Sequence, residues 1–154
     1  MKVLIVYDTV SPMKLTAKVA EVIGEVLKEK GIVFDSFLVK DVNKATVKDY
    51  DCVIAGGPTT YFNASAGIME FLNSFPDKSF SGKRAAAFDT QLQSRISGSG
   101  AEGIEKKLKK LGFEMITDAL VTYVEGKMNE MQLKVGEQGK AKGWAQEVAK
   151  ALSK

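Results

Sequence analysis

The feature of this sequence that most restricts its fold is a regular alternation of strand-like and helix-like segments along the whole chain. Continuous apolar runs, such as residues 3–7 and 52–55, are typical of strands that are covered on both faces of a sheet. Between such runs, apolar residues recur at helical spacing, as in residues 15–30 and 136–152. This alternation predicts a parallel sheet whose strands are joined by right-handed helical crossovers.

The pattern places five strands and four longer helices. We expect strands at residues 3–7, 32–39, 52–55, 84–88 and 113–124, and helices at residues 15–30, 64–75, 101–111 and 136–152. Asp35-Ser36 splits the second strand, which is therefore expected near an edge of the sheet. Residues 41–50 leave room for one or two helical turns, 91–100 are expected to form a long polar connection, and 125–135 are expected to be irregular.

A chain of 154 residues fits one domain. We therefore predict an α/β three-layer sandwich in a single domain that spans residues 1–154. Its five-stranded parallel sheet is expected to have the order 2-1-3-4-5, with helices on both faces. In such a sheet a ligand lies beyond the carboxyl ends of the strands, where the winding direction reverses.

Composition excludes several classes of function. The chain has no histidine and one cysteine, so His-based catalytic triads are excluded and no metal site is expected. Cys52 lies in an apolar run and is expected to be a buried thiol, which agrees with a reducing, cytoplasmic location. No segment approaches the roughly 20 apolar residues of a membrane span. The net charge is +3, and the lysines punctuate helical positions, so neither a nucleic acid nor a membrane is an expected partner.

The first candidate ligand loop spans residues 8–16 and runs into the first helix. It carries the hydroxyl groups of Thr9, Ser11 and Thr16, together with the ammonium group of Lys14. Free backbone N–H groups and the helix dipole make a helix N-terminus a site for anions. The loop therefore indicates a phosphate site, with the alternative that Ser11 or Thr16 is simply the N-cap of the helix.

The second candidate loop follows the third strand. Gly56 and Gly57 allow the backbone to approach a ligand closely, and Pro58 stiffens the turn. Tyr61 and Phe62 are adjacent aromatic residues in a polar loop, and an exposed ring there is suited to stacking on a flat ring system. The alternative is a hydrophobic staple for the next helix.

The third candidate loop begins with Asp89, Thr90 and Gln91 at the end of the fourth strand and ends in the Gly/Ser-rich residues 98–100. Its amide groups can satisfy the polar edge of a heterocycle, with the alternative that it is an Asp/Thr turn with a mobile tip. The three loops share one edge of the sheet. Together they describe a site for a flat heterocycle joined to a phosphate.

Several motifs resemble those of the flavodoxin family, and the resemblance covers essentially the whole chain. Residues 56–61 are similar to the family's G-[ST]-P-T-x-[FY], residues 16–20 to T-E-K-M-A, residues 88–90 and 98–101 to F-D-T…G-S-A-A, and residues 124–126 to V-E-G. The resemblance implies non-covalently bound FMN. By position, it implies that the phosphate contacts Thr9, Ser11 and Thr16, the ring face contacts Tyr61, and the ring's polar edge contacts Thr59, Asp89 and Thr90.

The first loop departs from the family pattern. It contains no glycine, is two residues longer than usual, and includes Pro12 and Lys14. We interpret Lys14 as a source of charge that replaces the missing glycine geometry. Phe62 stands where relatives often have glycine, and is an alternative to Tyr61 as the stacking residue. The candidate cofactor-binding residues are Thr9, Ser11, Lys14, Thr16, Pro58, Thr59, Thr60, Tyr61, Phe62, Asp89, Thr90 and Gln91; none is assigned a catalytic role.

The function implied by the resemblance is that of an FMN-binding electron-transfer flavoprotein, in which the cofactor performs the chemistry. An unidentified redox protein is its expected partner, and the chain itself is expected to be a monomer or a weak homodimer. One alternative is an FMN-dependent NAD(P)H or quinone oxidoreductase. Another is a domain of this fold that has lost FMN. A receiver domain is set aside, because the aspartate required after the third strand is replaced by Gly56 and Gly57.

Overall fold

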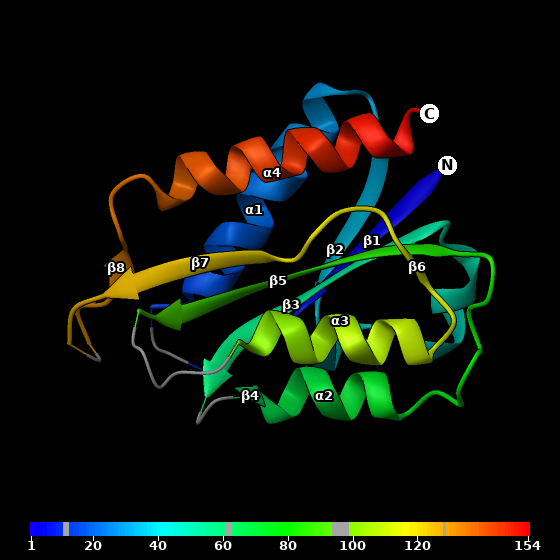
Figure 1. Ribbon diagram of the computed structural model, residues 1–154, viewed down its shortest axis with the longest axis horizontal. Helices are drawn as coiled ribbons and strands as arrows, with labels where there is room; N and C mark the ends of the chain where they lie inside the picture. Colours follow the sequence, from blue (N-terminus) through cyan, green and yellow to red (C-terminus); the bar gives the residue numbers. More distant parts are fainter. Residues whose placement is uncertain (11–12, 61–62, 94–98, 128) are drawn as a thin grey trace.

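A twisted sheet forms the middle layer of the protein, and helices cover both of its faces (Figure 1). A computed structural model describes residues 1–10, 13–60, 63–93, 99–127 and 129–154. Helices α1 and α4 lie on one face of the sheet, and α2 and α3 lie on the other. The α-helices are α1 (Leu15–Glu29), α2 (Ala66–Asn73), α3 (Gly100–Lys110) and α4 (Glu137–Leu152), and two short 3-10 helices are η1 (Val39–Asp41) and η2 (Lys44–Asp49).

The strands pair in the order β2-β1-β3-β5-β7-β8. Their bounds are β1 (Lys2–Tyr7), β2 (Val33–Leu38), β3 (Cys52–Thr60), β4 (Asn63–Ala64), β5 (Arg84–Leu92), β6 (Glu114–Met115), β7 (Leu120–Glu125) and β8 (Gln132–Leu133). The pairs from β2 to β7 are parallel, which confirms the predicted order 2-1-3-4-5, with β2 at an edge. The structure adds β8 antiparallel to β7, β4 antiparallel to β3, and β6 parallel to β5.

The central strands β1, β3 and β5 contain continuous runs of apolar residues, and both faces of these runs are buried. Along β1, Val3 and Ile5 pack against α1 and α4, whereas Leu4 and Val6 point to the opposite face and pack with α2 and α3. All four side chains are fully buried. The same alternation runs along β5, where Ala86 and Phe88 face α1 and α4, and Ala85 and Ala87 face α3. Side-chain period 2 therefore assigns each strand residue to one of two cores.

The helices begin and end close to the predicted positions. Helix α1 follows Lys14, which adopts a left-handed backbone conformation with φ 50°, and it is followed by Gly31 at φ 71°. A left-handed glycine after a helix terminates it without the steric cost that other residues bear. Helix α3 buries Ile104 and Leu108 and exposes lysines, as predicted for a solvated helix face.

Two strands extend further than the sequence predicts. β3 continues through Gly56-Gly57-Pro58 to Thr60, and β5 continues through Leu92. The expectation that the glycines and proline end the strand is wrong, because β3 stays paired with β5 as far as Pro58 and Thr90. The pairing between β1 and β3 has already ended at Gly56, so the missing N–H of Pro58 interrupts no ladder with β1.

The predicted fifth strand is divided. Residues 113–124 form β6 and β7, separated by residues 116–119, and the segment expected to be irregular contains β8.

Gly56 is required by the packing of β3 against β5, because a Cβ atom there would overlap the ring of Phe88 on the neighbouring strand. Cys52, at the start of β3, is fully buried, as predicted.

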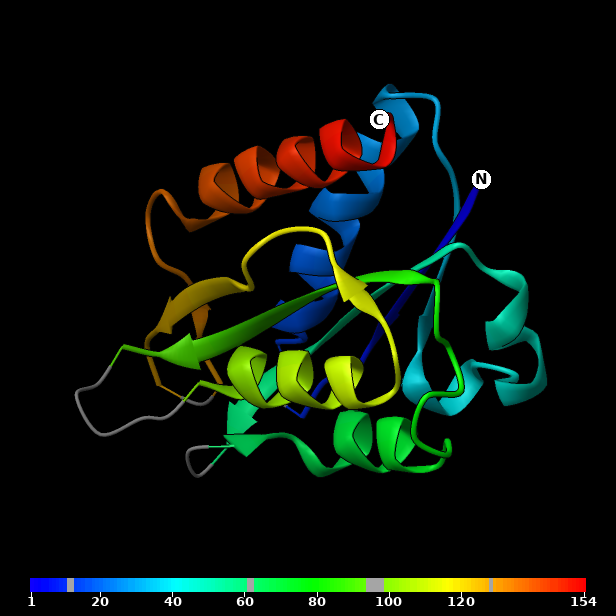
Figure 2. The same ribbon diagram turned by 45° about the vertical axis from the view of Figure 1, so that its right-hand side comes forward.

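Both chain termini lie at the amino-terminal end of the sheet. The Met1 amino group is 4.0 Å from Oδ2 of Asp51, just before β3, and Nη1 of Arg84 at the start of β5 donates to the carbonyl of Ala151 near the C-terminus. The two ends therefore lie away from the carboxyl ends of β5 and β7 in both ribbon views (Figures 1 and 2). Among the described residues, no helix combines the length and apolar character needed to cross a bilayer.

Candidate functional site

A cavity of about 150 Å³ lies at the carboxyl ends of the central strands. It is walled by the segment after β1, the first turn of α1, the ends of β3, β5 and β7, and the residue before β8. Its lining residues are Thr9, Val10, Leu15, Thr16, Pro58, Thr59, Thr90, Gln91, Leu92, Val124 and Met131. Strand β2 lies on one side of β1, and β3, which follows β2 in the sequence, lies on the other side of β1. The winding direction of the chain therefore reverses at β1, and the cavity occupies this topological switch point of the sheet.

The cavity wall is mixed in character and carries no ionisable group among its described lining residues. Four threonine hydroxyls and one glutamine amide supply hydrogen-bonding groups, and the remaining side chains are apolar. An apolar wall with a few convergent polar groups is typical of small-molecule and cofactor sites. Val10 and Leu92 are exposed at its rim, at 59% and 50%.

Two of the lining hydroxyls contact each other. The Oγ1 atoms of Thr16, in the first turn of α1, and Thr90, on β5, are 2.8 Å apart, and both side chains are buried. Alternation along β5 places Thr90 on the face that carries α1. The pair therefore joins α1 to the sheet and presents two adjacent hydroxyls at the cavity.

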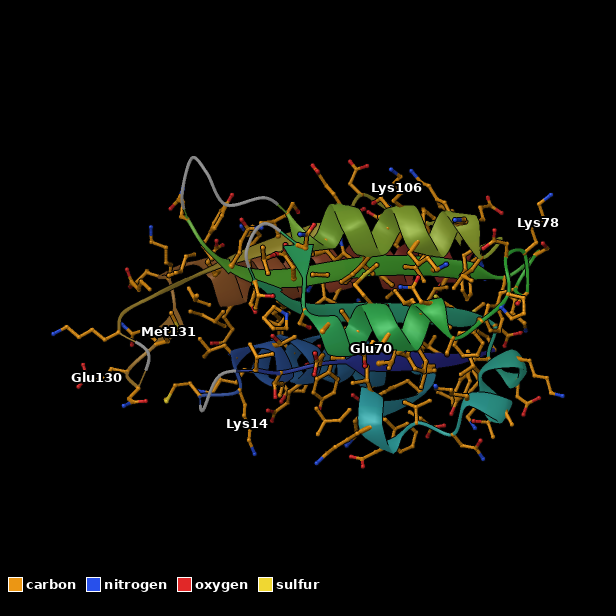
Figure 3. The ribbon with its side chains drawn as sticks, turned by 90° about the horizontal axis from the view of Figure 1, so that it is seen from below. Lys14, Glu70, Lys78, Lys106, Glu130 and Met131 are labelled. Carbon is orange, nitrogen blue, oxygen red and sulfur yellow. The ribbon has the colours of Figure 1, made fainter. Side chains whose placement is uncertain are left out.

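The N-terminus of α1 lies beside this pair. Its N-cap is Lys14, whose side chain makes no capping hydrogen bond, and the first turn contains no acidic residue. The positive end of the helix dipole is therefore uncompensated by a carboxylate of α1. Thr16 lies inside the first turn, so the alternative that it is the N-cap is wrong. Lys14 itself is exposed at the same end of the molecule as Met131 (Figure 3) and does not line the cavity.

Asp8 fixes the start of the first loop. Its Oδ1 accepts from the backbone N–H of Thr9 at 2.9 Å, and its Oδ2 accepts from the hydroxyl of Ser65 at 2.6 Å. Ser65 is the N-cap position of α2. A Cβ atom on Gly67 would overlap the Asp8 carboxylate, so glycine there allows the close approach. The loop that carries Thr9 is thereby tied to α2.

Asp89 lies on β5, next to Thr90, and its side chain faces the other way. The residue is fully buried, and its Oδ2 accepts hydrogen bonds from Thr59, Gln91, Ser99 and the Ala101 backbone at 2.8–3.4 Å. Within the described part of the chain, Oδ1 has no hydrogen-bond partner. Burial raises the pKa of the Asp89 carboxyl above its ordinary value, against the opposing effect of these donors.

Thr59 links the same carboxylate to α3. Its hydroxyl donates to Asp89 at 3.1 Å and accepts from the backbone N–H of Gly100 at 2.8 Å. A Cβ atom on Gly100 would stand 2.7 Å from that hydroxyl, so glycine is needed for the approach. Because a hydroxyl has one hydrogen, Thr59 has no further proton to donate to a ligand.

The structure brings half of the predicted site residues together. Those that line the cavity are Thr9, Thr16, Pro58, Thr59, Thr90 and Gln91; those that do not are Lys14, Thr60 and Asp89; and Ser11, Tyr61 and Phe62 lie outside the described residues. Asp89 and Thr90 belong to β5, so the alternative of a turn at these residues is wrong. The stacking and stapling roles considered for Tyr61 and Phe62 stay predictions, whereas the alternative that Ser11 is the N-cap of α1 is wrong, because Lys14 holds that position.

Sequence reasoning missed the apolar part of the wall. The missed lining residues are Val10, Leu15, Leu92, Val124 and Met131. Leu92 and Val124 are near the carboxyl ends of their strands, so extending the strand pattern would have found them. Met131 precedes β8, whose antiparallel pairing with β7 has no local sequence signal.

The comparison with known families decides the assignment. The sequence profile of the flavodoxin family matches residues 9–144, which include the cavity residues on all of its walls. The chain belongs to the flavodoxin family. A comparison with curated proteins gives no match.

Solved structures share the flavodoxin fold. A flavodoxin from the domain Archaea superposes with a TM-score of 0.79 at 21% identity, and each chain is covered over 100% of its length. Flavodoxin 1 from Bacillus cereus gives a TM-score of 0.78 at 17% identity, with 97% of this chain and 98% of that chain covered. In rubredoxin oxygen:oxidoreductase from Desulfovibrio gigas, 99% of this chain matches 36% of the larger chain, with a TM-score of 0.77 at 22% identity.

Proposed function

We propose that the protein binds FMN non-covalently at the switch-point cavity and carries electrons between redox partners. Proteins of the flavodoxin family generally bind FMN. The observation that carries the proposal is the cavity itself, which places hydroxyl groups and the uncompensated N-terminus of α1 beside an apolar wall. FMN has the matching parts: an anionic phosphate, a hydroxylated chain and a flat ring system.

Each part of the wall has a role in this proposal. Thr9, Thr16 and the α1 N-terminus would hold the phosphate, because a helix N-terminus supplies N–H donors and a favourable dipole. Pro58, Leu92 and Val124 would pack against apolar surface and exclude water. Bound FMN would supply the redox chemistry, and the chain's part is to bind it and set its surroundings. A cavity of about 150 Å³ encloses part of a molecule of this size, so the rest would extend beyond the described walls.

The first experiment is flavin binding. Protein purified from flavin-supplemented cells is expected to show flavin absorbance, and the flavin-free protein is expected to quench the fluorescence of added FMN. Absence of both signals would contradict the proposal and favour a family member that has lost its cofactor.

A second measurement separates a carrier from an enzyme. The FMN-loaded protein is expected to be reduced by dithionite but only slowly by NADH or NADPH alone. Rapid reduction by a nicotinamide nucleotide, with turnover of a quinone, would favour the FMN-dependent oxidoreductase instead.

The proposal also covers the location, the partner and the oligomeric state of the protein. We expect a cytoplasmic location, an unidentified redox protein as partner, and a monomer or weak homodimer. The expectation that no nucleic acid is bound is supported by α3, whose lysines have no aromatic residue between them; Lys106 of this group is exposed in Figure 3. A nucleic-acid interface concentrates such charge with aromatic residues between the cations.

A further inference from the structure

We propose that Asp89 is a positioning residue: its carboxylate holds the ends of β3 and β5 and the first turn of α3 together and thereby sets the shape of the flavin cavity without touching the flavin. This inference rests on the proposed function for its effect on binding. The hydrogen-bonded arrangement around Asp89 exists in the flavin-free protein and can be tested there without any flavin.

The hydrogen bonds to Asp89 come from three elements. Oδ2 accepts from Thr59 on β3 at 3.1 Å, from Gln91 on β5 at 2.8 Å, and from the backbone N–H of Ala101 on α3 at 3.1 Å. The hydroxyl of Ser99, the N-cap of α3, lies 3.4 Å away. One oxygen atom thus accepts from both central strands and from a residue of α3 that lies twelve positions further along the chain.

The residues that Asp89 holds include cavity residues, whereas Asp89 does not line the cavity. Thr59 and Gln91 both line it, and both donate to the Asp89 carboxylate. Asp89 is fully buried, and alternation along β5 directs it to the α3 face while Thr90 faces Thr16. The position of two lining side chains therefore depends on a carboxylate behind them.

The cost of burying this carboxylate indicates that its charge is needed as an acceptor. Among the residues that the structure describes, Oδ1 has no partner, and the donors to Oδ2 are all neutral. The titratable side chains on the packed elements include Glu102 on α3 and Tyr123 and Glu125 on β7, and none of them is among the causes of the raised pKa of Asp89. A buried charge without a cation is unfavourable unless several hydrogen bonds compensate it.

Protonation therefore weakens the Asp89 clamp, by which we mean the hydrogen bonds from Thr59, Gln91 and Ala101 to Oδ2 of Asp89. A neutral carboxylic acid is a poorer acceptor than a carboxylate, because charge-assisted hydrogen bonds are roughly twice as strong as neutral ones. As the pH falls through the pKa of Asp89, the bonds from Thr59, Gln91 and Ala101 loosen together. We expect flavin affinity to be complete above this pKa and to decline below it.

The first test uses the flavin-free wild-type protein. In an NMR titration, the amide signals of Gly100 and Ala101 are expected to follow the same pKa as the Asp89 carboxyl carbon. The exposed carboxylate of Glu102, which is on the same helix turn, serves as the internal control. If the amide signals of Gly100 and Ala101 do not change as the Asp89 carboxyl titrates, the proposed clamp is wrong.

The second test measures riboflavin affinity as a function of pH. Riboflavin is the probe because it lacks the phosphate, whose own titration would mask the effect between about pH 4 and 7. The wild type and the control Glu102→Gln are expected to lose at least about threefold in affinity toward low pH. In Asp89→Asn the amide oxygen is a neutral acceptor at every pH, so a flat profile is expected, near the reduced affinity that the wild type shows at low pH.

A third variant removes the acceptor. Asp89→Leu leaves the donors of Thr59, Gln91 and Ala101 unpaired, and its riboflavin affinity at neutral pH is expected to fall about tenfold or more, with Asp89→Asn as the conservative rescue. Wild-type affinity in Asp89→Leu, or the same pH profile in wild type and Asp89→Asn, would overturn the inference. If the wild type binds no riboflavin or FMN at any pH, the proposed function fails, and the NMR titration alone then decides the clamp.

Discussion

The hydroxyl groups of Thr16 and Thr90 lie 2.8 Å apart on the wall of the cavity, although 74 residues separate them in the chain. The family resemblance implies that Thr16 contacts a phosphate and Thr90 the polar edge of a ring. Their contact means that one ligand group placed here meets both hydroxyls. Because either hydroxyl can be the donor, one proton of the pair stays available for a ligand acceptor.

Replacing Thr16 by valine tests the phosphate assignment. The substitution keeps the shape of the side chain and removes a hydrogen bond to a charged group, which contributes about 1.5–3 kcal/mol. FMN affinity is expected to fall at least about tenfold, whereas riboflavin affinity changes by less than about twofold. Fluorescence quenching titrations measure both. Thr46→Val is the control, since the Thr46 hydroxyl bonds to the carbonyl of Asn43 in the segment before β3. Equal losses for both ligands would show that the phosphate lies elsewhere.

Gly56 is expected to tolerate no side chain. A Cβ atom at this position overlaps the ring of Phe88, which is fully buried between β5 and the helices. Gly56→Ala should therefore lower the free energy of unfolding by about 1–3 kcal/mol, as overpacked cores do. Urea unfolding measures the change. Gly103→Ala in α3 is the matched control: nothing lies within 4 Å of the added atom, and a gain of about 0.5–1 kcal/mol is expected. Wild-type stability in Gly56→Ala would contradict the packing argument.

The stability of the flavin-free protein is expected to depend on pH through Asp89. Burial raises the pKa of this carboxyl in the folded protein above its ordinary value of 3.8, so the folded state binds the proton more tightly than the unfolded state. The resulting stabilisation is complete below pH 3.8 and is lost as the pH rises through the folded pKa. The wild type should therefore lose stability relative to Asp89→Asn over that interval.

Urea unfolding of both proteins at a series of pH values measures this difference. Glu102→Gln, which alters an exposed carboxylate on α3, should follow the wild type. A difference between wild type and Asp89→Asn that stays constant with pH, or that changes in the opposite direction, would show that the pKa of Asp89 is not raised.

Cys52 is expected to be chemically inert in the folded protein. Its side chain is fully buried in β3, and burial raises the pKa of the thiol to about 12. The thiolate is the reactive form, so Ellman's reagent should fail to label the native protein at neutral pH and should label one thiol after unfolding in urea. Stoichiometric labelling under native conditions would contradict the burial of Cys52.

The order of the sheet could be predicted from the sequence because its information is local. Residues such as Val3 to Val6 are apolar on both faces, and the helices between the strands have a clear 3.6-residue period. The strand ends could not be predicted, because they depend on long-range pairing. Gly56-Gly57-Pro58 looks like a stop signal by residue type, yet its pairing with the end of β5 overrides the local preference.

The sequence predicts those residues of the candidate site that lie at the end of a strand or at the start of a helix. Thr9, Thr16 and Thr90 were found because carboxyl ends of parallel strands share one edge of the sheet. Lys14 was interpreted as a ligand from its position alone, and its exposed side chain does not line the cavity. The direction of the Asp89 side chain, opposite to that of Thr90, follows from period 2 along β5.

The positions of the chain ends have a practical consequence. The Met1 amino group lies near Asp51, and Ala151 is held by Arg84, so both ends leave the molecule from the edge of the sheet opposite the cavity. A linker, an affinity tag or an electrode tether can be attached at either end with the mouth of the cavity facing outward. Immobilised in this orientation, the protein would present the edge that holds the cavity to solution.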